Sequence, residues 1–518
     1  MDKKILLISI MLYPQYPNSG VDHIAGFLRW KGYLVDIAYF HKDNSLDEVK
    51  TNISYDYDYF GLYVDIKNVE RCMLLADYIK ENTSAPIWFG GAYVSSCYKN
   101  LLEDCKGVDY IIIGGGEEPL LYLLTHDLGA DLDNHPHIAS RTSLEGKRFN
   151  ESKIFEYPVA EDYFIRYPEA KGFYTYCLQS KSNTCGGCCT FCINWCIERD
   201  RLNFHYRTTE AILGEIRHMY ETYNITHFFF IDDDLLDPGA KESKNRIAKL
   251  CKEIINSEMK VTMTGYIKAN SLTECKEDED LLDLMSCAGF VSLFVGIESG
   301  SQTDLYLFRK QARVEDNKTI LPLLYKHHIK PEYEMIMFHP YATIDSLKEN
   351  FLFLRDVKSC NYRQYAFTNV SIYQNTELWR QASRDRLLTE KYSYKDPDMY
   401  SYLHSDVDYM AKFIKKHFCS SKEIGSLVNA DQLVTYYYRF SHYSESVGSL
   451  EKAVNKVRQD NFELMQYMFE PLYMRCDYDV CERRYAIFER EYKNQAETIQ
   501  KLINKMLKLS ILDAKQRK

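Results

Sequence analysis

Short apolar runs alternate with amphipathic stretches along the first 135 residues. The runs are three to six residues long, and the stretches between them carry apolar residues at helical spacing, as over 22–30 before Gly32. Uninterrupted apolar strands that alternate with helices are typical of a parallel sheet covered by helices on both faces. The pattern therefore predicts a doubly wound α/β domain over residues 1–135, with strands at 5–10, 34–38, 59–64, 87–89 and 110–113.

A second alternating series begins near Phe173, after a polar, proline-containing connector over residues 136–170. Its clearest helix spans 208–223, where Ile212, Ile216 and Met219 fall on one face behind a threonine N-cap. Six strand-and-helix repeats predict a partial (β/α)6 barrel, open on one side, over residues 171–395. The expected strands lie at 173–178, 227–231, 261–266, 291–295, 333–338 and 364–372.

The pattern changes again after about residue 395. Glycine becomes scarce, strand signals are weak, and helical periodicity returns over 451–468 and 484–512. We therefore expect a helical C-terminal region over 396–518. It contains only three cysteines, Cys419, Cys476 and Cys481.

The charge balance narrows the range of partners. The chain has 64 Lys and Arg against 74 Asp and Glu, a net charge of −10. Proteins that track nucleic-acid phosphates need a basic excess, so we expect no nucleic-acid partner.

The beginning of the chain resembles a short signal peptide, because Lys3 and Lys4 precede an apolar run. No small-residue cleavage site follows, and we interpret the run as a buried strand. No apolar run approaches the roughly 20 residues of a membrane span. We therefore expect a cytoplasmic protein.

Five of the 16 cysteines lie between Cys185 and Cys196. In a protein expected in the cytoplasm, such a cluster indicates metal ligands rather than disulfides. Cys185, Cys189 and Cys192 form a C-x3-C-x2-C pattern, and three thiolates on one loop can hold three irons of a [4Fe–4S] cluster. The fourth iron then stays open to another molecule.

A structural zinc site is the alternative for these cysteines. Cys185 with Cys188, and Cys189 with Cys192, are both C-x2-C pairs, the spacing typical of zinc ligands. The two pairs are adjacent, however, and four nearly contiguous cysteines close a tetrahedron awkwardly. We therefore favour the iron–sulfur cluster, with Cys188 and Cys196 spare.

The cysteine spacing, the aromatic Phe191 just before the last cysteine, and the repeats that follow resemble the radical S-adenosylmethionine (SAM) superfamily over residues 1–390. Further motifs are similar to the subgroup that carries an N-terminal cobalamin-binding domain. They are 207–213 with Phe230-Ile-Asp-Asp, Gly296-Ile-Glu-Ser-Gly-Ser, and Pro340-Tyr-Ala-Thr-Ile-Asp-Ser. Gln374-Asn-Thr stands where the subgroup has a Pro-Gly-Thr turn, which leaves the shape of that turn open.

The resemblance implies a set of SAM contacts around the cluster: Phe191, Asp232, Asp233, Lys268, Glu298 and Ser299. Lys268, at the end of the third barrel strand, would suit the SAM carboxylate, and Glu298 would accept from the SAM amino group or ribose. Each has a plainer interpretation, since aspartates after a strand can cap a helix and Lys268 can be a solvated surface charge.

The first domain resembles the cobalamin-binding fold. The residues that carry this resemblance and would line the site follow the fourth and fifth strands: Gly90, Gly91, Gly114, Gly115 and Glu117. Ligands of open parallel sheets bind beyond the carboxyl ends of the strands, where bare glycine backbone permits a close approach. The alternative is that these glycines only form tight turns.

Two positions depart from the pattern of that fold. The Asp-x-His-x-x-Gly motif that supplies a histidine to cobalt is missing, because Asp22-His23-Ile-Ala-Gly26 has the wrong spacing. Radical SAM members of this type commonly leave that cobalt face without a histidine. Tyr63-Val64-Asp65 stands where small hydroxyl residues are usual, and its bulk would narrow the groove for the nucleotide tail. A retained fold without cobalamin is therefore the alternative.

The resemblance implies an enzyme that takes electrons from a donor such as flavodoxin or ferredoxin. Reductive cleavage of SAM gives a 5′-deoxyadenosyl radical, which abstracts hydrogen from an unactivated carbon of a peptide or small natural product. With cobalamin, the expected outcome is C-methylation; without it, cross-linking, epimerisation or rearrangement is the alternative. In either case the cofactors carry the chemistry and the protein supplies orientation.

Two other classes of protein are weaker alternatives. A non-catalytic zinc-binding interaction protein would hold zinc and would not cleave SAM. A methylthiotransferase would gather three cysteines of its first domain for a second cluster, whereas Cys72, Cys97 and Cys105 do not fall together at strand ends.

Overall fold

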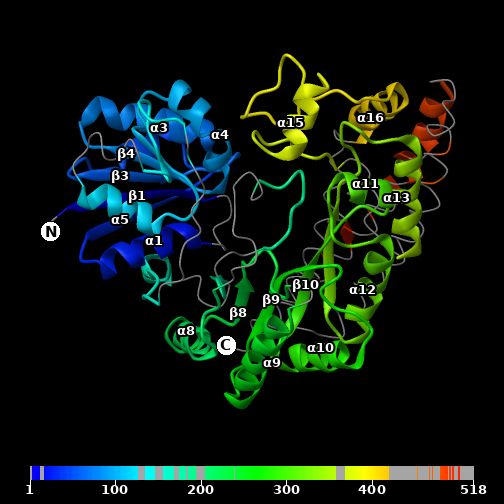
Figure 1. Ribbon diagram of the computed structural model, residues 1–518, viewed down its shortest axis with the longest axis horizontal. Helices are drawn as coiled ribbons and strands as arrows, with labels where there is room; N and C mark the ends of the chain where they lie inside the picture. Colours follow the sequence, from blue (N-terminus) through cyan, green and yellow to red (C-terminus); the bar gives the residue numbers. More distant parts are fainter. Residues whose placement is uncertain are drawn as a thin grey trace.

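The computed structural model describes residues 3–11, 17–126, 135–145, 147, 156–168, 174–181, 185–193, 205–237, 240–357, 368–418 and 479–487, and other positions between 452 and 504. Two α/β units lie side by side, with the first on the left of Figure 1 and the second on the right. Most of the expected helices at 451–468 and 484–512 fall outside the described residues, as do Cys196, Cys419 and Cys476. None of the helices that were described is long and apolar enough to cross a membrane.

The first unit is built on a six-stranded sheet with the order β2-β1-β3-β4-β5-β6. Its five parallel strands coincide with the predicted ones: β1 (Lys4–Met11), β2 (Leu34–His41), β3 (Tyr59–Tyr63), β4 (Ile87–Gly90) and β5 (Tyr110–Ile112). This is the order of a doubly wound sheet, in which the winding changes direction between β1 and β3. The sequence did not reveal the antiparallel β6 (Ile138–Ala139), since two residues leave no alternation pattern.

Helices cover both faces of this sheet. They are α1 (Ser19–Trp30), α2 (Leu46–Thr51), α3 (Val69–Asn82), α4 (Ala92–Asp104) and α5 (Glu117–Thr125). Leu7 and Ile112 belong to the core under α1 and α5, whereas Leu6 and Phe89 belong to the core under α2, α3 and α4. Neighbouring strand residues point to opposite faces, and both faces are buried, so the strands are continuous apolar runs.

The second unit contains a five-stranded parallel sheet with the order β11-β10-β9-β8-β7. Its strands are β7 (Thr175–Leu178), β8 (His227–Phe230), β9 (Thr262–Lys268), β10 (Phe290–Glu298) and β11 (Lys330–Met335). The helices that follow them are α8 (Thr209–Tyr223), α9 (Lys241–Asn256), α10 (Lys276–Ala288), α11 (Gln302–Leu307), α12 (Val314–Lys326) and α13 (Ile344–Asp356). The predicted layering of parallel strands and helices is confirmed.

The predicted sixth strand is described only in part. Residues 361–367 lie outside the described residues, and the next stretch makes a single parallel bridge, between Phe338 and Asn369. Two helices then follow, α15 (Glu377–Arg384) and α16 (Ser405–Phe418).

Contacts on two sides hold the first unit against the rest of the chain. On one side, Arg29 of α1 donates hydrogen bonds of 2.5 and 2.7 Å to Asp162 of α7 (Asp162–Arg166). On the other, the hydroxyl of Tyr93 donates to the carbonyl of Tyr394 at 2.8 Å, and the Tyr394 hydroxyl donates to Asp104 at 2.8 Å. The carboxyl ends of the two sheets are thereby held in a fixed relation.

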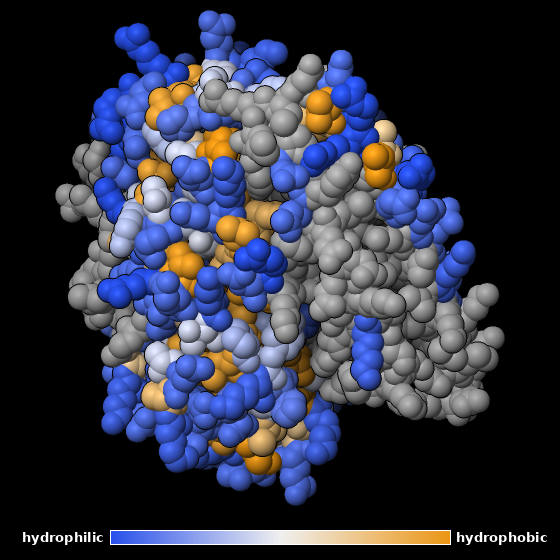
Figure 2. Space-filling model, turned by 90° about the vertical axis from the view of Figure 1, so that its right-hand side faces the viewer, coloured by the Kyte–Doolittle hydropathy of each residue, from blue (hydrophilic) through white to orange (hydrophobic). Residues whose placement is uncertain are grey.

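The surface carries mixed polarity. On the face shown in Figure 2, the coloured residues are mostly hydrophilic, with hydrophobic ones scattered among them. Apolar residues scattered singly over a surface are normal in soluble domains.

Candidate active site between the two units

The cysteine loop, residues 185–193, follows β7 and is held at its centre by Thr190. The Thr190 N–H donates to the carbonyl of Phe308 at 3.0 Å, and its hydroxyl donates to the carbonyl of Leu307 at 3.0 Å. Its own carbonyl accepts from the N–H of Leu378 at 2.9 Å, in the first turn of α15. The end of α11 and the start of α15, both distant in sequence, therefore fix the loop.

The cysteines of this loop have different surroundings. The Cys188 thiol lies 3.8 Å from the carbonyl of Arg309, to which it donates a weak hydrogen bond. The Cys185 sulfur accepts from the N–H of Gly187 at 3.2 Å. Burial raises the pKa of Cys185, and it raises the pKa of Cys189 to about 11, while a lysine beside each thiol acts in the opposite direction. A bound metal is what displaces thiol protons in such surroundings.

The zinc alternative requires Cys188 beside the other cysteines of the loop. Within the part of the chain that the structure describes, no group of three His, Cys, Asp or Glu side chains is drawn together around one point, and this holds for both cysteine sets. Cys188, which that alternative requires, is bonded to Arg309 instead. Cys185, Cys189 and Cys192 remain the set whose spacing suits a cuboidal cluster, in which each thiolate binds a different iron.

Lys268 ends β9, and its ammonium lies 3.3 Å from the buried carboxylate of Asp234. The lysine side chain is 11% exposed, which contradicts its interpretation as a solvated surface charge. Burial lowers the pKa of Lys268, but Asp234 and Cys185 outweigh burial and raise it. A Cβ at Gly187 would lie 3.6 Å from the ammonium, so Lys268 packs against the cysteine loop.

Glu298 ends β10 and pairs with a lysine that the sequence did not single out. Lys310 donates to the Glu298 carboxylate at 2.8 Å, and its side chain is 6% exposed. β10 changes register against β11 between Val295 and Glu298, where Glu298 adopts a φ of 57°. The carboxylate thus lies over Gly296, whose missing Cβ would be 3.3 Å from it and 3.0 Å from the Lys310 ammonium. The glycine leaves room for the ion pair.

Two buried lysines therefore flank the cysteine loop, Lys268 beside Cys185 and Lys310 beside Cys189. Burial lowers the pKa of Lys310, but Glu298 and Cys189 outweigh burial and raise it. One sequence signal could have found Lys310: it lies in a polar run after the turn that ends a barrel strand, where functional side chains of such folds gather.

The aspartates after β8 point in different directions. Asp232 is fully buried and accepts from the N–H of Ser180 at 3.0 Å and of Lys181 at 3.2 Å, so it fastens the end of β7 to the end of β8. Asp233 is exposed and lies near enough to Cys185 to raise the pKa of that thiol. Of the two expected residues, Asp233 faces the cysteine loop and Asp232 positions the backbone.

Ser299 is fully buried within the turn after Glu298. Its oxygen lies 2.7 Å from Oδ1 of Asn350 and 3.0 Å from Oδ2 of Asp304. Its side chain is therefore engaged by α11 and α13 and shapes the turn that presents Glu298.

Phe191, the aromatic residue among the expected SAM contacts, belongs to the cysteine loop. Its ring centroid lies 5.3 Å from that of the fully buried Phe308, edge to face. The ring adds an apolar anchor to the hydrogen bonds that fix the loop.

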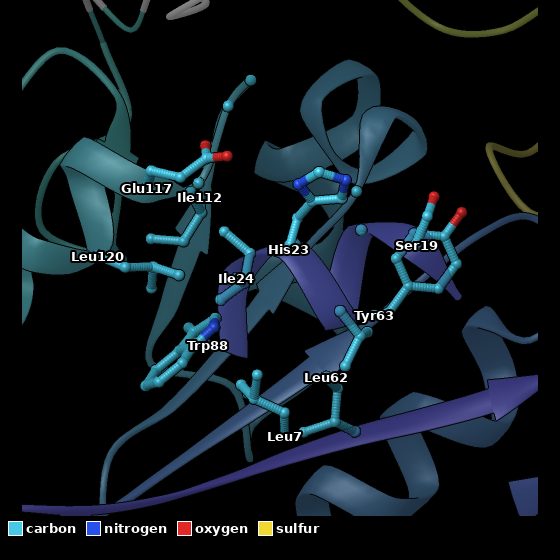
Figure 3. Close-up of a pocket in the computed structure, with 18 of the residues that line it drawn as sticks. Leu7, Ser19, His23, Ile24, Leu62, Tyr63, Trp88, Ile112, Glu117 and Leu120 are labelled. Atoms are coloured by element: carbon cyan, nitrogen blue, oxygen red, sulfur yellow. The ribbon is translucent and has the colours of Figure 1, made fainter. Parts of the chain in front are cut away.

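A cavity of about 240 Å³ opens at the carboxyl ends of β1, β3, β4 and β5 (Figure 3). We call it the glycine groove. Its rim contains all five residues expected there: Gly90, Gly91, Gly114, Gly115 and Glu117. Its apolar walls, shown in Figure 3, include Leu7, Leu62, Trp88, Ile112 and Leu120.

The rim glycines have two distinct roles. A Cβ at Gly90 would meet no atom within 4 Å, so a side chain there would project into open space. Gly91 has a φ of 125°, and its Cβ would lie 2.7 Å from the carbonyl oxygen of Val64, so the turn itself requires glycine. Tyr63, whose bulk the sequence led us to expect in the groove, belongs to its lining.

The glycine groove is completed by the second unit. Gln179 after β7 and Ile231 after β8 belong to its lining. Glu117, at the start of α5, accepts from the hydroxyl of Tyr157 at 3.1 Å. The groove therefore opens at the same edge of the barrel from which the cysteine loop departs.

Two family models match this chain. The B12 binding domain matches residues 6–124, and the radical SAM superfamily matches residues 180–354.

The curated relatives are enzymes. The chain is 24% identical over 366 residues to the anaerobic magnesium-protoporphyrin IX monomethyl ester cyclase of Rubrivivax gelatinosus, covering 66% of this chain and 62% of the relative. It is 27% identical over 177 residues to the 4′-phospho-dehydrooxetanocin synthase of Priestia megaterium, covering 32% of this chain and 24% of the relative. The chain thus spans less than two thirds of the length of each.

Solved structures share the whole fold. The cobalamin-dependent SAM radical enzyme OxsB, with aqua-cobalamin and SAM bound, has a TM-score of 0.70 at 18% identity, covering 99% of this chain and 80% of that one. The radical SAM methyltransferase TsrM from Kitasatospora setae, with cobalamin and a [4Fe–4S] cluster, has a TM-score of 0.61 at 14% identity, covering 89% and 100%. At these identities the likeness is one of fold, and it confirms the predicted fold class.

Proposed function

Because the chain belongs to the radical SAM superfamily and carries a B12 binding domain over residues 6–124, we propose that it is an enzyme that methylates an unactivated carbon. Its substrate would be a peptide or a small natural product. One observation carries this proposal: the glycine groove of the first unit is completed by Gln179 and Ile231, at the strand ends that lead to the cysteine loop. Methyl transfer to a substrate radical requires that the two cofactor sites lie close to each other.

The residues present fit both cofactors. Cys185, Cys189 and Cys192 would hold a [4Fe–4S] cluster, and the open space at Gly90 leaves room for a large ligand such as cobalamin. When bound, the cluster supplies the electron that cleaves SAM, and cobalamin supplies a carrier for the methyl group.

The charged side chains around the cysteine loop would both bind SAM and stabilise the thiolates. Lys268 would receive the SAM carboxylate, and Glu298 would accept from its amino group or ribose. Lys310 holds Glu298 at 2.8 Å and keeps a cation beside Cys189, while Lys268 does the same beside Cys185. The two lysines would offset the negative charge of three thiolates in a site shielded from water.

The balance of the reaction needs two SAM molecules and two electrons for each methyl group. One SAM gives its methyl group and leaves as S-adenosylhomocysteine. The other takes one electron, removes a hydrogen atom from the substrate, and leaves as 5′-deoxyadenosine and methionine. Both electrons would come singly from an external donor such as flavodoxin or ferredoxin.

A ring-forming reaction without methyl transfer is the second candidate. The observation that favours it is that the curated relatives are named as a cyclase and a synthase rather than as methyltransferases. The same SAM site would serve: one SAM would take an electron and remove a hydrogen atom from the substrate, and the ring-closed radical would lose a proton and pass one electron to an external acceptor. No S-adenosylhomocysteine would be released.

Anaerobic reconstitution of the full chain with iron and sulfide, with and without cobalamin, tests these proposals. Dithionite would supply electrons, and 5′-deoxyadenosine and S-adenosylhomocysteine would be measured by mass spectrometry. The methylation proposal expects both products, the second only with cobalamin. Release of 5′-deoxyadenosine alone by the cobalamin-loaded protein would favour the second candidate, and absence of both products would overturn the proposed function.

A further inference from the structure

The inner side of the barrel sheet is accessible, whereas its outer side is not. Phe229, Tyr266 and Phe294 are each partly exposed, while their strand neighbours on both sides are buried. Phe294 lies opposite Tyr266 in the register of β10 and β9. The ring centroids are 5.1 Å apart for Phe229 and Tyr266 and 5.3 Å apart for Tyr266 and Phe294. These three rings form a continuous aromatic wall inside the sheet.

Acidic residues continue this inner surface on β11. Glu332 lies opposite Phe294 in the register of β10 and β11. Glu334 lies two residues further toward the carboxyl end, so it points to the same side. Glu334 is exposed, whereas Met335 beside it is 2% exposed and faces the helices.

Glu334 directly precedes Met335, which lies opposite Glu298 in the register of β10 and β11. Burial and the charge of Glu298, at the cysteine loop, raise the pKa of Glu334, while Lys67 of the first unit lowers it. Lys67 belongs to the turn after β3, on the edge of the sheet that carries the glycine groove. No hydrogen bond or ion pair joins Glu334 to another residue of the described ranges.

An accessible glutamate is ordinarily a solvated surface residue. Glu334 differs in three respects: it lies on the inner side of a parallel sheet, beside an aromatic wall, and within the field of a second carboxylate, Glu298. The charge of Glu298 is already paired with Lys310 at 2.8 Å, which leaves Glu334 as the carboxylate of this surface that can receive a further cation.

Building on the proposed function, we propose that the substrate is an organic cation, an amine or ammonium compound with an apolar or aromatic body. Its N–H groups would donate charge-assisted hydrogen bonds to Glu334. Its body would lie against Phe229, Tyr266 and Phe294, where aromatic faces also attract a cation. This arrangement anchors a substrate at the mouth of the barrel, next to Glu298.

The test compares two probes of equal shape and opposite charge, phenethylamine and 3-phenylpropionate. Their binding to the reconstituted full chain is measured anaerobically by isothermal titration calorimetry. We expect the amine to bind up to about fivefold more tightly than the acid, since an ion pair with an exposed carboxylate is worth about 0–1 kcal/mol. Glu334→Gln should remove this preference, and Glu334→Lys should reverse it.

Glu349→Gln is the matched control, because Glu349 is exposed on the outer helix α13 and should leave the preference intact. Equal binding of the two probes by the wild type, or an equal loss in the Glu334→Gln and Glu349→Gln variants, would overturn the inference. Release of 5′-deoxyadenosine by the wild type without any probe tests the proposed function separately. Cleavage of SAM without a preference for the amine would thus refute only the cationic substrate.

Discussion

Replacement of Lys310 by methionine tests whether the buried ion pair beside the cysteine loop stabilises the site. The variant keeps the length and the apolar stem of the side chain but removes the ammonium that lies 2.8 Å from Glu298. The Glu298 side chain is 20% exposed, so its charge would be left largely buried without a partner. Removal of one member of a buried pair costs about 3–5 kcal/mol, and the residual exposure places this site near ~3 kcal/mol.

The expected effect is large enough to read from thermal unfolding. A unit of roughly 150–250 residues loses about 2–4 °C in melting temperature for each kcal/mol, so Lys310→Met should melt about 6–12 °C lower. Differential scanning calorimetry of the metal-free protein measures this. The raised pKa of Lys310 means that the pair contributes fully below its ordinary value of 10.5 and loses its effect only as the pH rises through the folded-state pKa. The difference should therefore be the same at about pH 7 and about pH 9.

Two controls make this prediction specific. Lys318 pairs with Asp356 at 3.1 Å, and the two side chains are 44% and 39% exposed. An exposed ion pair is worth about 0–1 kcal/mol, so Lys318→Met should hardly change the melting temperature. The double variant Lys310→Met/Glu298→Gln should recover much of the lost stability, because it leaves no unpaired charge. Equal shifts for Lys310→Met and Lys318→Met, or no recovery in the double variant, would refute the reasoning.

Three further predictions concern other parts of the molecule. Cys188→Ala should retain the absorbance of the reconstituted cluster and Cys189→Ala should lose it, because only the second removes an expected iron ligand. Burial raises the pKa of Asp22 from 3.8 to about 7, so the folded chain holds a proton that the unfolded chain releases. The free energy of unfolding should therefore fall as the pH rises from about 4 to about 7. Asp22→Asn should flatten this pH dependence, measured by urea unfolding. Gly90→Leu should abolish retention of cobalamin on gel filtration without lowering the melting temperature, whereas Gly91→Ala should lower it through strain at a φ of 125°.

Most of the fold could be predicted from local patterns in the sequence. The parallel strands were predictable because both faces of each sheet are buried, which makes every strand an apolar run. The cysteine set stays a prediction, and it rests on an equally local pattern, since one loop carries all three thiols. β6 was not predicted, because it has only two residues and its partner strand β5 is distant in the sequence.

The electrostatic partners of the site could not be predicted. Lys310 and Asp234 reach Glu298 and Lys268 only after the strands align, and no spacing in the sequence encodes these pairs. The direction of a side chain just beyond a strand is also set by tertiary contacts. For this reason Asp232 faces the backbone of Ser180 rather than the opening.

The central claim is that Cys185, Cys189 and Cys192 hold a cluster that cleaves SAM. The most direct measurement is iron content together with 5′-deoxyadenosine release after anaerobic reconstitution, for the wild type, Cys188→Ala and the triple alanine variant of the three ligands. The wild type and Cys188→Ala should hold about four irons per chain and release 5′-deoxyadenosine, and the triple variant should do neither. Iron and SAM cleavage that persist in the triple variant, or zinc in place of iron in the wild type, would contradict this account.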